Sequence, residues 1–267
     1  MSILLKKFAE FKNCERIWAI GSIHGNLQGI KNIHNHIFSE FNPSDQIVYL
    51  GNVIGVGLQS TDVLDEVINF RLKTMAKYNI EPEKIIYLRG SQEEMWSKLL
   101  ELQISPNPKE VLLWMFSHGV DKTLQSYNFQ KDEILEISSL DTIDLSRWTT
   151  KIKNQVGLFE GHRDYYTNLL HAAYSSTKKI LFVNRGVDVS RPLSAQSDCF
   201  WWGYQDFSKI SIPYYDFRRI VRGYDPKKSG PEKSSIVCSL YKGSGFGENI
   251  IAGLFSPNGD IIDLFEA

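Results

Sequence analysis

Two patterns in the first hundred residues of this 267-residue chain predict an α/β fold. Short apolar runs alternate with longer stretches in which apolar residues recur at helical spacing, which is the order expected of a parallel sheet flanked by helices. Three glycine turns also recur, at Gly21, Gly51 and Gly90, each directly after an apolar run. Glycine lets the backbone turn sharply past a strand end. Three such turns indicate one shared site at the carboxyl edge of the sheet, where α/β proteins bind ligands.

The elements of this first part follow from periodicity and from helix-ending residues. The expected strands end at the glycine turns and span residues 16–20, 46–50 and 84–89. The expected helices lie between and after them, at 27–41, 60–78 and 92–102. Pro43 ends the first of these helices.

The pattern changes after Pro106, and the rest of the chain divides into a helical part and a strand-rich part. We expect a single domain over 1–267 with a helical cap inserted at about 106–176, and no strand within that cap. The expected cap helices are 108–117, 146–155 and 162–174. The expected later strands are 179–183 and 217–221, followed by a β-meander of 234–240, 250–255 and 260–265 whose last turn contains Asn258-Gly259.

Composition excludes several classes of protein. The formal net charge is −1, so no bulk electrostatic attraction to nucleic acid or to an anionic membrane is expected. The cysteines Cys14, Cys199 and Cys238 are widely spaced and odd in number, which favours reduced thiols over a disulfide framework or a zinc ribbon. The N-terminal apolar run Ile3–Leu5 is too short for a signal-peptide core. We therefore expect a cytoplasmic protein.

Five short segments, each after an apolar strand, carry a family resemblance. They read GSIHGN, GNVIGVG, LRGSQEEM, LFVNRGVD and VRGYDP in chain order. This set resembles the calcineurin-like metallophosphoesterases, in the branch of the bacterial serine/threonine protein phosphatases and diadenosine tetraphosphatases. The resemblance covers the chain from Arg16 to Phe265. It implies a β-sandwich flanked by helices, an αββα arrangement, which agrees with the α/β pattern above.

The resemblance also implies a site, and this chain departs from it at nearly every position. The family binds two divalent metals, such as Mn or Fe/Zn, with carboxylates, an asparagine and histidines. Of those ligands only the histidine at His24 is retained. The catalytic histidine of the family becomes Gln92, and the phosphate-clamping arginine becomes Val56 beside Gly55. The former metal-site positions are Ser22, His24, Asn52, Ser91, Asn184 and Tyr224.

These replacements predict a protein that binds no metal and has no catalytic residues. Two neighbouring dications need an anionic oxygen between them and a metal-activated water, whereas Asn52 offers only a neutral carbonyl oxygen. Buried carboxylates without metal would cost several kcal/mol, and neutral side chains remove that cost. The sequence therefore favours a catalytically inactive pseudophosphatase that acts by binding a protein or a phosphorylated ligand.

Two alternatives stay open at this stage. One is a residual phosphoesterase, a hydrolase that uses a weak metal at His24 or a rearranged Ser22–His24 pair. The other is a metal-free receptor for an anion or a nucleotide, formed by the glycine-turn amides together with Arg89 and Arg185.

Two further segments bear on partners. The aromatic segment Cys199–Phe217 is expected to be core in large part, and any exposed portion is the best candidate for a partner surface. The glycine-rich run Gly243–Gly247 is followed by no helix and no Lys-Ser/Thr, so it predicts a flexible turn and not a phosphate loop.

Overall fold

The computed structural model describes residues 7–130, 133, 137, 141–196, 198–204, 206–234 and 236–267. The N-terminal run Ile3–Leu5 lies outside the described residues. Within them, no helix combines the length and the apolar character needed to cross a membrane. Cys14 is half-buried, while Cys199 and Cys238 are buried.

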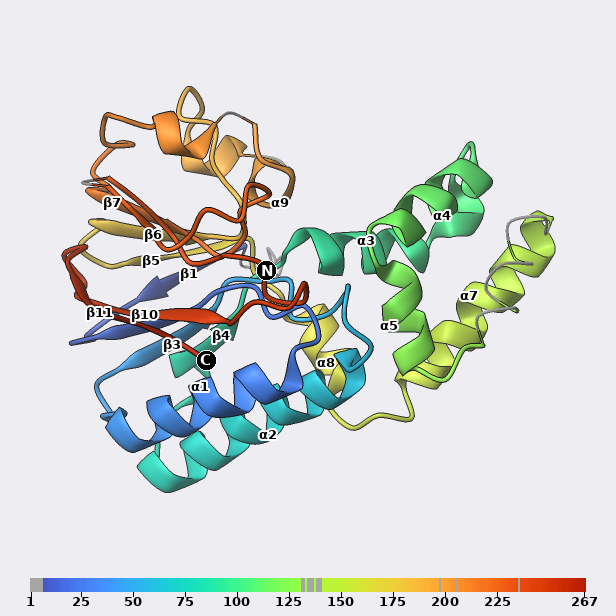
Figure 1. The fold of residues 1–267 in the computed structure, drawn as a ribbon, viewed down its shortest axis with the longest axis horizontal. Coiled ribbons are helices and arrows are strands. Elements are labelled where there is room, and N and C mark those ends of the chain that lie inside the picture. Colours follow the sequence, from blue (N-terminus) through green and yellow to red (C-terminus); the bar gives the residue numbers. More distant parts are fainter. Residues whose placement is uncertain are drawn as a thin grey trace, which may run out of the picture.

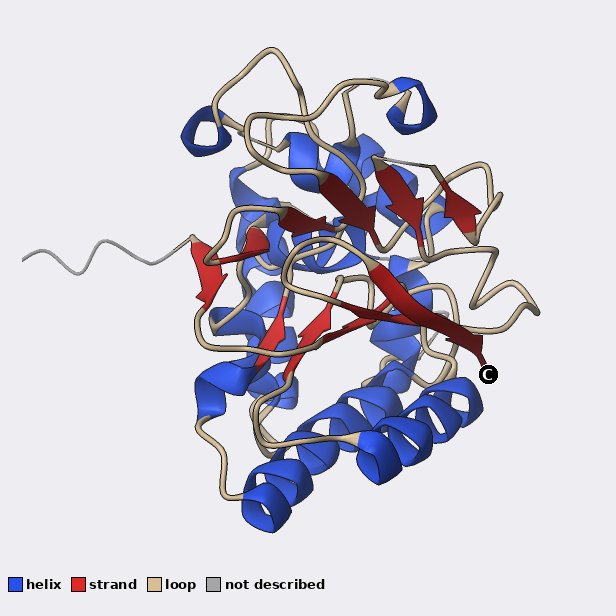
Figure 2. Cartoon of the chain, turned by 90° about the vertical axis from the view of Figure 1, so that its left-hand side faces the viewer, coloured by secondary structure: helices blue, strands red, loops and turns tan. Residues whose placement is uncertain are grey.

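The described strands form two sheets that pack face to face (Figures 1 and 2). The six-stranded sheet has the order β1 (Phe8–Phe11), β5 (Ala172–Ser175), β6 (Ile180–Val183), β7 (Arg219–Arg222), β9 (Val237–Ser239), β8 (Glu232–Lys233). The five-stranded sheet has the order β11 (Ile261–Glu266), β10 (Ile251–Phe255), β2 (Ile17–Ile20), β3 (Gln46–Tyr49), β4 (Ile85–Tyr87). Strands β2, β3 and β4 run parallel, as the alternating pattern predicts.

Helices cover the outer faces of this sandwich. The five-stranded sheet is covered by α1 (Leu27–Glu40) and α2 (Ser60–Tyr78), while the short α9 (Cys199–Trp202) lies on the side of the six-stranded sheet (Figure 1). The α/β sandwich that the sequence and the resemblance imply is therefore confirmed. The helix α3 (Ser91–Leu99) begins directly at the third glycine turn.

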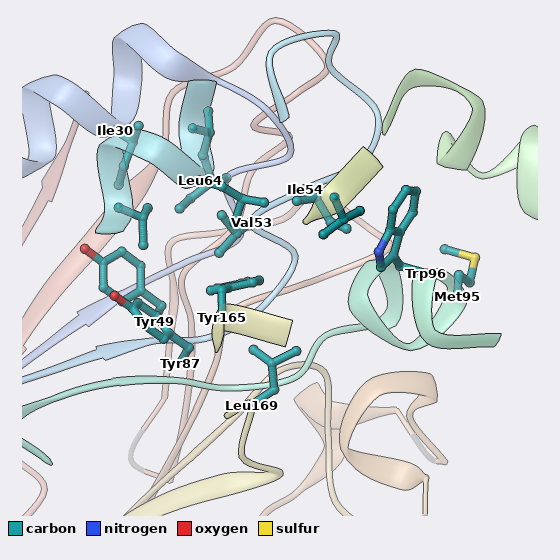
Figure 3. Close-up of a cluster of buried hydrophobic side chains, with 14 of the residues drawn as sticks. Ile30, Tyr49, Val53, Ile54, Leu64, Tyr87, Met95, Trp96, Tyr165 and Leu169 are labelled. Carbon is teal, nitrogen blue, oxygen red and sulfur yellow. The ribbon is translucent and has the colours of Figure 1, made fainter. Parts of the chain in front are cut away.

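The core has three parts that match these layers. Residues such as Ala19, Val48 and Phe182 fill the space between the two sheets. A second cluster joins the five-stranded sheet to α1, α2 and the cap, and its central side chains include Tyr49, Trp96 and Tyr165 (Figure 3). Because this cluster is continuous, the cap is packed onto the sandwich by the same apolar burial that holds α1 and α2.

The cap extends from the edge of the sandwich (Figure 1). It contains α4 (Pro108–Ser117), α5 (Val120–Ser126), α7 (Thr142–Val156) and α8 (His162–Thr167). The bounds of α4 agree with the expected helix, and α7 begins earlier than expected because Asp141 caps it by accepting from the N–H of Asp144 at 2.9 Å.

Two sequence predictions are wrong in detail. The helix expected over 162–174 ends at Thr167, and Ala172–Ser175 is strand β5, since it pairs with β1 and β6 in the middle of a sheet. Sheet pairing outweighs the helix propensity of this alanine-containing segment. The expected β-meander is also wrong, because β9 lies in the six-stranded sheet and only β10 and β11 form a hairpin.

Candidate functional site

Five loops meet at one edge of the sandwich, and backbone hydrogen bonds join four of them, those after β2, β3, β6 and β7. These are the loops that the five motifs predict, and each follows β2, β3, β4, β6 or β7. The bonds that join them are Ser22 N–H to Gly223 O at 2.8 Å, His24 N–H to Asn52 O at 2.9 Å and Tyr224 N–H to Asn184 O at 2.7 Å. The structure therefore brings together Ser22, His24, Asn52, Asn184 and Tyr224.

A single buried carboxylate organises the second and third loops. The Oε2 atom of Glu93 accepts from the N–H groups of Asn52 at 2.8 Å and Gly90 at 2.9 Å, and Oε1 accepts from Val53 N–H at 2.8 Å. The hydroxyl of Tyr165, on α8 of the cap, donates to Oε1 at 3.2 Å. Burial raises the pKa of Glu93, and its backbone N–H donors act in the opposite direction. Both carboxylate oxygens therefore accept hydrogen bonds from the protein, and Glu93 acts as a structural hub that joins the two loops and the cap.

The side chain of Asn52 lies between the second and third loops. Its Oδ1 accepts from Gln92 N–H at 3.0 Å and from Ser91 Oγ at 3.2 Å. Because a backbone N–H is one of the donors, Oδ1 and Nδ2 are unambiguous, and Nδ2 is left without a partner. Gly90 must lack a side chain here, since a Cβ would come within 2.3 Å of Asn52 Oδ1. Ser91 is thus a neighbour of Asn52, as the motif mapping implies.

The amides of Asn184 and Gln92 are oriented in the same way. Asn184 Nδ2 donates to the Leu50 carbonyl at 2.7 Å, and Gln92 Nε2 donates to the His118 carbonyl at 2.8 Å. The oxygen of each amide accepts no hydrogen bond, so Asn184 Oδ1 and Gln92 Oε1 remain unpaired. Gln92 also fills the space above Gly55, where a Cβ would lie 2.1 Å from Gln92 Oε1.

His24 lies at the centre of these loops. It is 2% exposed, and its φ of 52° is in the left-handed region. Burial lowers the pKa of His24 to about 3, although the Ile54 backbone acts in the opposite direction. That backbone group lies outside hydrogen-bonding geometry, and neither ring nitrogen of His24 has a hydrogen-bond partner. The imidazole is therefore neutral at physiological pH.

Aromatic rings surround this imidazole. The ring of Tyr224 packs edge-on to His24 with centroids 5.6 Å apart, and the rings of Tyr241 and Phe246 lie at 5.7 and 6.4 Å. Burial raises the pKa of Tyr224, so its hydroxyl stays protonated at neutral pH. Cations lie over two of these rings, Arg185 over Tyr224 at 5.8 Å and Lys228 over Phe246 at 3.7 Å.

The donor set at the former metal positions does not fit a pair of divalent cations. It offers neutral amides, a hydroxyl and one imidazole, with an aromatic ring beside that imidazole. Glu93 is the nearby carboxylate, but both of its oxygens already accept hydrogen bonds. Among the described residues no group of three or more His, Cys, Asp or Glu could hold a metal ion. The buried polar atoms without partners here are Ser22 Oγ, both ring nitrogens of His24, Asn52 Nδ2, Asn184 Oδ1 and Gln92 Oε1.

A cleft of about 420 Å³ opens above this centre, between the loops and the cap. The lower wall contains His24, Gln92 and Tyr224, and helices α4 and α5 supply the opposite wall. Large aromatic side chains and two cations share the lining. They are Trp114, Phe116, Trp202, Phe246, Lys122 and Arg185. A larger hollow of about 480 Å³ follows the polar surface of α7, away from the loops.

The two candidate anion-binding arginines differ. Arg185 lines the cleft, and none of the described carboxylates pairs with it. Arg89 instead donates to Glu94 at 2.7 Å and lies over the ring of Trp201. Arg89 is therefore engaged in a structural ion pair and does not line the cleft. Val56, at the position of the phosphate-clamping arginine, adopts φ 60°, an uncommon conformation for a β-branched residue.

The aromatic segment 199–217 is mostly core. Its buried rings are Phe200, Trp201, Phe207, Tyr214 and Phe217. Tyr204 and Tyr215 are both 64% exposed, but they are single exposed rings. The aromatic side chains that line the cleft are Trp202 from this segment, Trp114 and Phe116 from the cap, Tyr224 and, from the glycine-rich run, Phe246. Sequence reasoning missed Trp114 and Phe246, although three glycines around Phe246 could have indicated a presented side chain.

Comparisons with known proteins agree with this architecture. No family model matches the chain, and no curated protein matches it. A predicted diadenosine tetraphosphatase of known crystal structure is similar over 98% of both chains, with 14% identity and a TM-score of 0.56. A cold-active protein-tyrosine phosphatase from the psychrophile Shewanella sp. is similar over 100% of this chain and 84% of its own, with 9% identity and a TM-score of 0.55.

At these identities the comparisons establish the fold alone. They agree with the resemblance that the five loop motifs carry, and the two sheets with their flanking helices lie as that resemblance implies. This chain has the calcineurin-like metallophosphoesterase fold.

Proposed function

We propose that this protein is a catalytically inactive, metal-free member of the phosphatase-like fold that binds a phosphorylated ligand in the cleft above His24. The observation that carries the proposal is the set of buried, unpartnered polar atoms at the former metal positions. They lie directly beneath a cleft whose Arg185 pairs with none of the described carboxylates. Buried polar groups without partners are costly, so native proteins keep them where a ligand or a functional group uses them.

The side chains at the centre account for the proposed loss of hydrolysis. A metal-dependent phosphoesterase needs a metal-activated water and an anionic bridge between cations. Asn52 and Asn184 are amides with only one acceptor oxygen each, and Asn52 Oδ1 is already shared by two donors. Gln92 cannot supply a proton to a leaving group, because an amide does not titrate in the physiological range. Val56 offers no charge to a phosphate.

Electrostatics support an anionic ligand. Arg185 is half-buried in the cleft wall, where its planar guanidinium can form paired hydrogen bonds to phosphate oxygens. Lys122 lines the same cleft, although Asp121 lies 3.4 Å away and partly neutralises it. Arg185 is therefore the principal cation for a phosphate. A protein that carries the phosphate on a side chain would present the same group.

The alternative of a residual enzyme with a Ser–His pair receives no support from the geometry. Ser22 Oγ and both nitrogens of His24 have no hydrogen-bond partner, so the two side chains do not bond to each other. Ser91 Oγ donates to Asn52 Oδ1 at 3.2 Å and is not paired with His24. Nucleophilic catalysis requires the nucleophile and its base within hydrogen-bond reach.

Binding of inorganic phosphate and phosphorylated small molecules, followed by thermal unfolding, tests the proposal. We expect anions to raise the unfolding temperature of the wild-type protein and of Arg147→Gln, whose arginine is exposed on α7. Arg185→Gln is expected to lose that stabilisation, since the shift depends on ligand affinity. Equal shifts for Arg185→Gln and wild type would place the anion elsewhere and contradict the proposed site.

A further inference from the structure

The glycine-rich run Gly243–Gly247 presents one aromatic side chain to the cleft. Gly243, Gly245 and Gly247 have φ values of 122°, 86° and 98°, a backbone that L side chains rarely adopt. Phe246 lies between the last two and is 55% exposed, although it is a large apolar ring. Its ring contacts Lys228 and the edge of His24. A loop of this kind holds the ring at the mouth of the cleft.

A second aromatic face comes from the cap. Trp114, on α4, is 44% exposed and lines the same cleft. Its ring packs against Trp202, with centroids 5.7 Å apart, and against His118 at 4.5 Å. These contacts fix the indole from one side and leave part of it open to the cleft. Exposed aromatic rings on both the cap and the loop side are the kind of surface on which planar groups stack.

The charged group of the cleft lies in the same lining. Arg185 has no carboxylate partner among the described residues, and its guanidinium lies over the ring of Tyr224. The cleft therefore combines two open aromatic rings with one unpaired cation. Its volume of about 420 Å³ is near the lower end of the roughly 300–1,000 Å³ that small-molecule sites span, which suits a ligand with one ring system.

We propose that the ligand is an aromatic phosphomonoester, in which a planar ring stacks against Trp114 and Phe246 and a single phosphate pairs with Arg185. This inference rests on the proposed function and adds the class of ligand. The phosphate is held by the arginine at the cleft wall and not by a metal at the floor. The unpartnered atoms Gln92 Oε1, His24 Nδ1 and His24 Nε2 are buried beneath this surface. The ring and the phosphate are therefore held by Trp114, Phe246 and Arg185 in the cleft lining.

Two sources supply this chemistry, a nucleoside monophosphate and phosphotyrosine. The first carries a nitrogen heterocycle joined to the phosphate through a ribose, whereas the second carries a phenyl ring bonded directly to the phosphate oxygen. Titrations with adenosine monophosphate and with O-phosphotyrosine therefore distinguish the sources, and tighter binding of either one than of inorganic phosphate supports the proposal.

Isothermal titration with phenyl phosphate and inorganic phosphate tests the role of the rings. We expect phenyl phosphate to bind about tenfold more tightly than inorganic phosphate, because its ring stacks on aromatic side chains. A tenfold difference corresponds to about 1.4 kcal/mol. Trp114→Ala and Phe246→Leu are expected to remove that preference while leaving inorganic phosphate unchanged. Tyr215→Ala is the matched control, because Tyr215 is 64% exposed and outside the cleft.

The outcomes separate this inference from the proposed function. Equal affinity for phenyl phosphate and inorganic phosphate, both lost in Arg185→Gln, overturns the aromatic class and keeps the proposed anion site. A preference for phenyl phosphate that survives both Trp114→Ala and Phe246→Leu also overturns the assignment of the rings. Absence of binding for every phosphate overturns both. Thermal unfolding of each variant verifies that it is folded before titration.

Discussion

Two parts of the site differ in how many of their polar atoms have hydrogen-bond partners. We call the Glu93 network that holds the loops the frame, and the side chains around His24 the centre. In the frame, Glu93 accepts hydrogen bonds from Asn52, Val53 and Gly90, and from Tyr165 in the cap. In the centre, both nitrogens of His24 and one atom each of four neighbouring residues have no partner. The frame is a completed structural unit, while the centre retains capacity for additional hydrogen bonds. The difference separates the part of the site that holds the loops in place from the part above which we propose that a ligand binds.

The buried histidines show the same contrast. His34 bonds Glu66 and Tyr49, both at 2.7 Å, through its two ring nitrogens. His162 bonds Tyr127 at 2.7 Å and Asp65 at 3.0 Å, which joins the cap to α2. Because each carboxylate accepts, the opposite ring nitrogen accepts from the tyrosine hydroxyl. Where a buried histidine is structural in this protein, both nitrogens are bonded, and His24 differs from that rule.

The largest effect is expected from breaking the frame at Glu93. The Glu93→Gln variant replaces one acceptor oxygen by an amide donor, so two N–H groups lose their acceptor in a buried site. We expect a loss of about 4 kcal/mol in the free energy of unfolding, since each buried group left unsatisfied costs about 1–3 kcal/mol. Urea unfolding measures it, with Glu110→Gln on the exposed side of α4 as the control. A loss below that of the control would show that Glu93 does not hold the loops.

A smaller, pH-dependent effect is expected at His24. Burial lowers the pKa of His24 from 6.5 to about 3. The contribution of the neutral imidazole to the free energy of unfolding is therefore fully present above pH 6.5. It falls as the pH drops, because the unfolded chain takes up a proton that the native protein does not. At pH 4 the loss reaches about 3 kcal/mol. His24→Asn keeps a residue that tolerates positive φ and cannot titrate.

The comparison of two pH values isolates this contribution. Between pH 7 and pH 4, we expect the free energy of unfolding of His24→Asn, measured with urea, to fall by about 3 kcal/mol less than that of the wild-type protein. Burial also lowers the pKa values of His34 and His162, and these contributions remain in both proteins and cancel. The same acid sensitivity in wild type and variant would mean that His24 is protonated or accessible in the native state, against the account of a sealed, neutral centre.

The smallest effect is expected from relieving strain at Val56. A β-branched residue at φ 60° costs about 1–3 kcal/mol, and glycine removes that cost at an entropic penalty of about 0.5–1 kcal/mol. The free energy of unfolding of Val56→Gly, measured by thermal unfolding, is therefore expected to rise by about 1 kcal/mol. Val111→Gly, in the middle of α4, is the matched control and is expected to lose stability. Destabilisation of both variants would show that Val56 is held without strain.

Much of the fold was accessible from the sequence because its signals are local. The strands β2, β3 and β4 are fully or largely buried apolar runs that end at glycines, and α1 and α2 carry apolar residues at helical spacing. Strand β1 was missed because its pattern is short and half-buried, with Glu10 in the middle. The sequence pattern predicts a helix at strand β5, because the strand depends on pairing partners far away in the chain.

The site shows the same division between local and distant signals. The former ligand positions were located by the motifs, since each motif fixes a residue directly after a strand. The role of Glu93 as a hub was missed, because its partners at Asn52 and Val53 lie 41 and 40 residues away in sequence. Trp114 could not be assigned to the cleft, because the position of α4 over the loops depends on how the cap packs.

Hydrolysis of phenyl phosphate in the presence of Mn²⁺ tests the central claim most directly. Because the centre is neutral, we expect the wild-type protein to release no more phosphate than its His24→Asn variant across a range of Mn²⁺ concentrations. Metal-dependent release by the wild-type protein, abolished in His24→Asn, would show that the centre still supports catalysis and would contradict the proposal that this fold now serves binding alone.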